Sequence, residues 1–218
     1  MIEHVYRRAA RAASIDALVI ATDDERIARA AAAFDAVAVM TAATHASGTD
    51  RLAEVAAAVP CDLIVNVQAD EPLLDPAVID AVVEPMRRDP SLEMGTAARR
   101  LRSADELGNP SVVKVVCDIG GFALYFSRAP IPYSREGVFL DEARVHIGLY
   151  VYRRATLLRL AALSPGRLER LEGLEQLRAL ENGIRIHVVE TAFTSTEVNT
   201  AADLERVKAL LATTSHDG

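Results

Sequence analysis

The chain of 218 residues lacks an excess of basic residues, metal-type cysteine spacing and any long apolar run. Its formal net charge of −7 argues against non-specific binding to nucleic acid or to an anionic membrane. Cys61 and Cys117 stand in no CxxC or Cys/His pattern, which favours buried free thiols in a reducing cytosol over a zinc site. No run of about 18 apolar residues could cross a membrane. The charged, amphipathic first residues do not resemble a signal peptide, so we expect a cytoplasmic protein.

From residue 17 to residue 88 the sequence alternates short apolar runs with amphipathic, alanine-rich segments. The runs predict strands at 17–21, 37–40 and 63–68, and the segments predict helices at 1–13, 24–34, 49–59 and 76–88. Alternation of strand and helix with short loops predicts a parallel sheet covered by helices. Pro85 lies inside the last of these helices and should kink or shorten it.

The pattern changes after residue 94, where the predicted strands follow one another closely. They lie at 94–101, 112–117, 122–127 and 145–152, with a hairpin turn at 118–121. Helices at 155–163, 167–181 and 200–211 and a strand at 184–189 complete the chain. The length fits one domain. The sequence therefore predicts an α/β, Rossmann-like fold, with a mostly parallel sheet and an inserted antiparallel lobe that includes residues 109–152.

The strand at 63–68 leads directly into polar side chains. Gln68, Asp70 and Glu71 follow its apolar residues, and Pro72 ends the run. In open α/β sheets, ligands bind at the carboxyl ends of the strands. Carboxylate oxygens suit Mg²⁺, which usually takes one or two carboxylates together with substrate phosphates. A magnesium site is one explanation, and an ordinary polar exit from the strand is the other.

Two further segments carry polar groups at the ends of elements. Ser47 or Thr49 could cap the helix at 49–59, and a helix N-terminus with free N–H groups attracts phosphate. The same residues also fit an ordinary capped helix. Arg128 follows a strand and could bind a carboxylate through a bidentate fork, although an exposed arginine at a strand end has the same sequence.

The segment 146–150 places three residues on one face of a strand. His146, Gly148 and Tyr150 alternate, and the glycine leaves a gap in which a small ligand could lie. A single histidine on a strand more often has a structural role. Glu172 and Gln176 are four residues apart on the predicted helix and share a face, which suits either a polyhydroxy ligand or solvent.

Seven segments resemble the 3-deoxy-manno-octulosonate cytidylyltransferase (CMP-Kdo synthetase) family. Residues 66–72 read NVQADEP and resemble its NVQGDEP segment, with Ala69 in place of glycine. The other similar segments are HxSGTxRL at 45–52, NPNxVKVV at 109–116, ALYFSRxxIP at 123–132, HLGIYGYR at 146–153, ExLEQLR at 172–178 and VDTxEDLE at 198–205. Asp50 stands where the family often has glutamate, and Asn199 stands where it has aspartate.

The resemblance implies transfer of CMP from CTP to Kdo, giving CMP-Kdo and pyrophosphate for lipopolysaccharide biosynthesis. It implies a homodimer whose two copies contact each other through the antiparallel strands at 109–152. It implies Mg²⁺ held by Asp70, with Asn199 or Glu197 assisting. It implies nucleotide contacts from Ser47, Gly48, Thr49 and Arg51. It implies Kdo contacts from Gln68, Arg128, His146, Tyr150, Glu172 and Gln176.

The change at Asn199 bears on chemistry more than on folding. Asparagine caps a helix as well as aspartate does, but it is a neutral and weaker ligand for a hard dication. If this segment is extended, Glu197 and Asn199 point the same way, and Glu197 could supply the missing charge.

The family's first strand and basic loop, roughly IPARxxSxRLPGKPL, have no counterpart in these residues. Met1–Val5 instead resembles the helix that follows that loop. We therefore expect that one edge of the strand at 63–68 has no neighbouring strand, which would leave its backbone groups without partners there. Either the true start lies upstream, or the chain is a degenerate relative that binds sugar or dimerises without turnover. Activation of another acidic sugar, such as amino-Kdo, is a further alternative.

Overall fold

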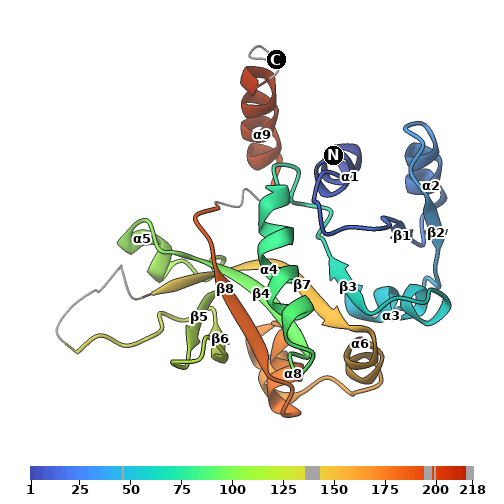
Figure 1. Ribbon diagram of the computed structural model, residues 1–218. Helices are drawn as coiled ribbons and strands as arrows, with labels where there is room; N and C mark the ends of the chain where they lie inside the picture. Colours follow the sequence, from blue (N-terminus) through green and yellow to red (C-terminus); the bar gives the residue numbers. More distant parts are fainter. Residues whose placement is uncertain (46, 136–142, 194–197, 199, 215–218) are drawn as a thin grey trace.

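The structure is a computed structural model that describes residues 1–45, 47–135, 143–193, 198 and 200–214 (Figure 1). Six strands form one sheet: β3 (Leu63–Asn66), β4 (Met94–Arg100), β5 (Lys114–Cys117), β6 (Ala123–Ser127), β7 (Arg144–Arg153) and β8 (Ile186–Glu190). Two more, β1 (Ile20–Thr22) and β2 (Ala38–Met40), form a separate parallel pair. The helices are α1 (Ile2–Ala9), α2 (Glu25–Ala32), α3 (Gly48–Ala58), α4 (Pro76–Arg88), α5 (Ala104–Gly108), α6 (Arg154–Ala161), α7 (Arg167–Glu172), α8 (Gln176–Glu181) and α9 (Ala201–Thr214).

The long strand β7 lies at the centre of the six-stranded sheet. It pairs antiparallel with both β3 and β4, while β4 pairs parallel with β8. Strands β3, β4 and β8 therefore run in one direction, and their carboxyl ends meet at one edge. The predicted α/β, Rossmann-like fold is confirmed, but the antiparallel strands are not only an added lobe. Strands β5 and β6 extend the sheet, whereas β7 enters its middle.

One edge of β7 divides between two neighbours. Tyr150–Arg153 pairs with β3, while Arg144 and Val145 pair with β5. The intervening residues, 146–149, therefore lie where the sheet forks. Gly148 and Leu149 therefore have no partner on β3 or β5 in the register of these strands.

Alternation along β7 divides its side chains between two apolar clusters. Ile147, Leu149 and Val151 pack with α4 on one face, where α4 crosses the sheet (Figure 1). Tyr150 and Tyr152 belong to the cluster on the other face, which includes residues of α3, α6 and α8. This period of two fixes which β7 residues can reach a ligand on the second face.

Helix α4 runs to Arg88, as the sequence predicts, and Pro85 does not shorten it. Asp75 caps it by accepting a hydrogen bond from the N–H of Ala77, and Pro76 occupies the first turn, where its missing N–H has no cost. Its buried residues, Val78, Ile79, Val82, Val83 and Met86, cover the sheet.

The single helix predicted at 167–181 is wrong. Helix α7 ends at Glu172, because Gly173 adopts the left-handed conformation with φ 62°, and α8 begins only at Gln176. Glycine tolerates this conformation without steric penalty and commonly ends helices. Glu172 and Gln176 therefore lie on different helices rather than on one face.

The pair β1–β2 has no strand pairing with the six-stranded sheet within the described ranges. Strand β3 likewise pairs with β7 alone among the described strands. Met40 is the last residue of β2 and is 48% exposed. Val37 directly precedes this strand and is 57% exposed.

Both cysteines are free and only half-buried, so the expectation of fully buried thiols was too strong. No helix in the described parts of the chain is long and apolar enough to cross a membrane.

Candidate active site

Asp70 lies just beyond the carboxyl end of β3 and is half-buried. Its backbone carbonyl oxygen accepts a hydrogen bond of 2.9 Å from the N–H of Val198. The segment that follows β8 is thus placed against the Asp70 loop at the carboxyl edge of the sheet. Asn199 and Glu197 lie outside the described residues, so their part in a magnesium site with Asp70 stays a prediction.

The four predicted nucleotide-binding residues lie at the start of α3. Ser47 and Gly48 form the open end of the helix, whereas the side chains of Thr49 and Arg51 have partners within the protein. The Ser47 hydroxyl oxygen caps the helix by accepting from the N–H of Asp50, and a Cβ on Gly48 would meet nothing within 4 Å. Thr49 is buried and donates its hydroxyl to Glu175 at 2.8 Å.

Arg51 has partners within the protein. Its guanidinium forms an ion pair with Asp23 at 3.2 Å and donates to the hydroxyl of Thr41. Asp23 and Thr41 directly follow β1 and β2. Arg51 therefore ties α3 to the carboxyl ends of these strands, next to the open N-terminal end formed by Ser47 and Gly48.

A row of aromatic rings lies along the fork in the sheet. The His146 ring packs edge-on against Phe126, with 5.0 Å between centroids, and lies 5.3 Å from Tyr150. A Cβ on Gly148 would lie 3.8 Å from Cγ of Gln68. The structure thus places Gln68 against the glycine that separates His146 from Tyr150, and the contact of these residues with a sugar stays a prediction.

Both ionisable rings in this row are neutral near pH 7. Burial lowers the pKa of His146 to about 3. Burial raises the pKa of Tyr150 well above its ordinary value, and the nearby Tyr152 and Glu175 raise it further. The fork therefore offers uncharged hydrogen-bonding groups, which suit the hydroxyl groups of a sugar.

Gln176 is buried at the start of α8, with 6% of its surface exposed. The sequence analysis assigned no role to its neighbour Glu175, but the structure gives this residue specific contacts. One oxygen of Glu175 accepts from Thr49, while Oε1 is buried, lies 3.7 Å from Arg178 and has no hydrogen bond within the described part of the chain. A glutamate beside a glutamine carries no spacing signal, so only the packing of α8 against α3 reveals it.

Arg128 and Glu172 are hydrogen-bonded to each other. The Glu172 carboxylate accepts from the Ser127 hydroxyl at 2.6 Å and from the backbone N–H of Arg128 at 2.9 Å. Burial alone would raise the pKa of Glu172, but these hydrogen bonds outweigh it and lower the pKa. The Arg128 guanidinium donates to the carbonyls of Glu172 and Pro110 at 2.8 and 3.0 Å. The two side chains join β6 to α7, and their contact with a sugar stays a prediction.

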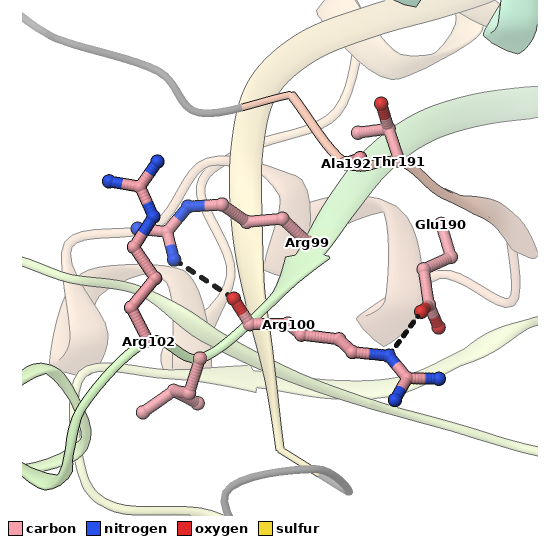
Figure 2. Close-up of a pocket in the computed structure, with 7 residues that line it drawn as sticks. Arg99, Arg100, Arg102, Glu190, Thr191 and Ala192 are labelled. Carbon is pink, nitrogen blue, oxygen red and sulfur yellow. Dashed lines mark hydrogen bonds and ion pairs between the residues drawn. The ribbon is translucent and has the colours of Figure 1, made fainter.

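A separate cavity of about 410 Å³ lies at the carboxyl ends of β4 and β8 (Figure 2). Figure 2 shows Arg100 paired with Glu190, and Arg99 donating to the carbonyl of Arg100. Arg99 also forms an ion pair with Glu106 at 2.8 Å. The described residues that line this cavity include none of the predicted site residues. Arg99 and Arg100 pair with Glu106 and Glu190, whereas the fork of β7 holds the predicted site residues, so we take the fork as the candidate site.

A family model described as Cytidylyltransferase matches residues 1–186. The chain belongs to the cytidylyltransferase family. Among similar cytidylyltransferases, a 3-deoxy-manno-octulosonate cytidylyltransferase of Geobacter metallireducens is 52% identical, over 95% of this chain and 85% of its own length. The enzyme of that name from Syntrophotalea carbinolica is 54% identical, over 97% and 88%.

Solved structures agree with this cytidylyltransferase assignment. A CMP:2-keto-3-deoxy-manno-octonic acid synthetase complexed with CTP has a TM-score of 0.91 and 42% identity, over 97% of this chain and 87% of its own. A 4-diphosphocytidyl-2C-methyl-D-erythritol synthase of Anaerococcus prevotii, at 12% identity and a TM-score of 0.63, covers 97% and 88% and shares the fold alone.

Proposed function

We propose that this cytidylyltransferase transfers CMP from CTP to Kdo and releases pyrophosphate. The observation that carries the proposal is the identity of 52% and 54%, over at least 95% of the chain, with relatives that bear this activity in their names. The solved synthetase that holds CTP supports the choice of nucleotide. The geometry of the carboxyl edge supports two adjoining halves of one site.

The sugar half of the site is the fork of β7. Gln68, Gly148 and the neutral rings of His146 and Tyr150 would surround the sugar acid. Neutral groups can exchange hydrogen bonds with its hydroxyls without the desolvation cost of an ion. The nucleotide half is the start of α3, where Ser47 caps the helix and the N–H groups of the first turn suit a phosphate.

Asp70 would hold Mg²⁺ between these halves. Its half-buried carboxylate follows a strand at the edge where ligands bind, and Mg²⁺ needs only one or two carboxylates in addition to substrate phosphates. The donor set therefore fits, with Asn199 and Glu197 as further candidates. Bound there, the ion would offset negative charge on the phosphates.

In the reaction, the anomeric hydroxyl oxygen of Kdo forms a bond to the α-phosphorus of CTP. The bond from that phosphorus to the bridging oxygen of the β-phosphate breaks, and pyrophosphate leaves with its electron pair. The hydroxyl proton is released. The protein's contribution is orientation: Gln68 and the β7 rings hold the sugar, and the α3 end holds the nucleotide, so that the attacking oxygen faces the phosphorus.

The test is a pyrophosphate-release assay with CTP, Kdo and Mg²⁺, together with mass spectrometry of the product. We expect CMP-Kdo with CTP and little product with other nucleoside triphosphates. Product only with another acid, such as amino-Kdo, would replace the substrate. Absence of product with every acid, despite sugar-dependent thermal stabilisation, would favour the non-catalytic relative.

We also propose a cytoplasmic homodimer whose contact includes the strands within 109–152. Strands β5 and β6 extend from the sheet as an exposed hairpin, with Leu124 exposed at 61% and Ile119 fully exposed. Apolar side chains at such a position favour burial against a second copy. Sedimentation equilibrium of the wild type and of Leu124→Glu tests this, since a shift of the variant toward monomer is expected.

A further inference from the structure

Strand β7 is irregular at the sugar half of the site. Thr96 of β4 pairs with Tyr150, whereas the next residue, Ala97, pairs with Ile147. Two residues of β7, Gly148 and Leu149, therefore have no counterpart on β4. Bulges of this kind change the direction of neighbouring side chains and are frequent beside active sites.

The hydroxyl of Thr96 occupies the centre of this bulge. It lies 2.7 Å from the carbonyl oxygen of Leu149, 3.3 Å from that of Ile147 and 3.0 Å from Nε2 of His146. Thr96 is fully buried, so water does not complete these contacts. Its hydroxyl thus joins the two carbonyls that border the bulge to the ring of the sugar-site histidine.

The number of protons decides the direction of each hydrogen bond. A hydroxyl has one proton to donate, and a carbonyl oxygen can only accept. Because the contact to Leu149 is the shortest, we assign the Thr96 proton to it. The oxygen of Thr96 is then an acceptor toward His146, which requires the proton of the neutral imidazole to be on Nε2.

We propose that Thr96 is a positioning residue that holds His146 as the Nε2–H tautomer, so that Nδ1 accepts a hydrogen bond from a hydroxyl of the sugar acid. This inference rests on the proposed function. No hydrogen bond engages Nδ1 within the described residues. The edge of Phe126 packs on the same ring at an interplanar angle of 80° and restricts its rotation. Burial keeps the ring uncharged, in line with the pKa of His146 of about 3.

Nuclear magnetic resonance of ¹⁵N-histidine protein reads the tautomer directly, without substrate. His146→Gln identifies the signals among those of the five histidines. We expect a protonated Nε2 and an unprotonated Nδ1 in the wild type and in Thr96→Ser, which keeps the hydroxyl. Thr96→Val has the same shape without the hydroxyl and should show a mixture of tautomers. A wild type protonated on Nδ1 would overturn the inference, even if the valine variant fails to fold.

Steady-state kinetics supply the second measurement. Loss of one well-placed hydrogen bond should raise KM for Kdo about threefold to tenfold in Thr96→Val, with KM for CTP unchanged and the serine variant near the wild type. An unchanged KM for Kdo together with an unchanged tautomer would refute the role of Thr96. The wild type could make no CMP-Kdo while the tautomer of His146 still differs between the wild type and Thr96→Val as described. That result would refute the proposed function but would leave the hydrogen bond between Thr96 and His146 supported.

Discussion

Gln68 lies against Gly148: a Cβ on the glycine would stand 3.8 Å from Cγ of the glutamine. The first residue follows β3 and the second lies in the bulge of β7, so the fork of the sheet brings them together. The distance is an ordinary van der Waals contact. One extra methyl group would therefore fit, whereas a larger side chain would fill the space between Gln68 and the aromatic row.

Gly148→Val should raise KM for Kdo more than tenfold with little loss of stability. The added methyl groups would occupy the space assigned to the sugar, while the backbone at Gly148 has no positive φ that would strain a side chain. Gly148→Ala is the matched control and should change KM much less. Kinetics at saturating CTP measure both. Equal kinetics for the valine variant and the wild type would place the sugar elsewhere.

Asp70→Asn should lower kcat about 100- to 1,000-fold, the usual cost of removing one charge-stabilising group. Its stability should change little, because the described hydrogen bond of Asp70 uses its backbone carbonyl. Asp62→Asn, at an exposed position before β3, serves as the control. Pyrophosphate release over a range of Mg²⁺ concentrations is the measurement. Full activity of the Asp70 variant would show that another residue holds the metal.

Glu172→Ala should destabilise the protein by about 2–3 kcal/mol. It would leave the Ser127 hydroxyl and the Arg128 N–H without the charged acceptor that they contact at 2.6 and 2.9 Å. Urea unfolding gives the free energy, and Glu172→Gln, which retains a carbonyl acceptor, should lose less. A stable alanine variant with a raised KM for Kdo would instead assign Glu172 to the sugar.

Acidification should destabilise the protein partly through His146. The unfolded histidine has a pKa near 6.5, whereas burial lowers the folded pKa to about 3. Below pH 6.5 the unfolded state binds a proton that the folded state does not, so stability falls from there toward pH 3. The slope from this residue approaches about 1.4 kcal/mol per pH unit.

The window between about pH 6.5 and 4.5 isolates this effect, because most carboxylates of the unfolded chain titrate lower. His187, whose pKa burial also lowers, contributes in the same direction. His146→Gln should therefore lose less stability than the wild type between pH 7.5 and pH 5 in chemical unfolding. Parallel losses in the two proteins would mean that His146 titrates normally.

Sequence periodicity predicted most elements to within a few residues, because burial of one face imposes a period of two or 3.6. It did not predict the position of β7. Alternation says which face a side chain occupies but not which strands become neighbours. It also missed the break at Gly173, where the conformation of one glycine outweighs helical spacing on both sides.

The candidate site was predictable where its residues gather in a short segment. Asp70 after a buried strand, and Gly148 between two ring-bearing residues, are signals of this kind. Thr96 and Glu175 gave no such signal. Their significance comes from contacts with His146 and Thr49, which are 50 and 126 residues away in the chain.

The central position of β7 decides when the sugar half of the site takes its shape. Tyr150 pairs with Asn66 of β3 on one side and with Thr96 of β4 on the other, so the backbone that carries its ring is ordered before any ligand arrives. The entropy of arranging this backbone is lost once, during folding, and not at each binding event. Discrimination among acidic sugars then resides in a rigid template of fixed stereochemistry, and a sugar of different configuration meets a surface that cannot adjust to it.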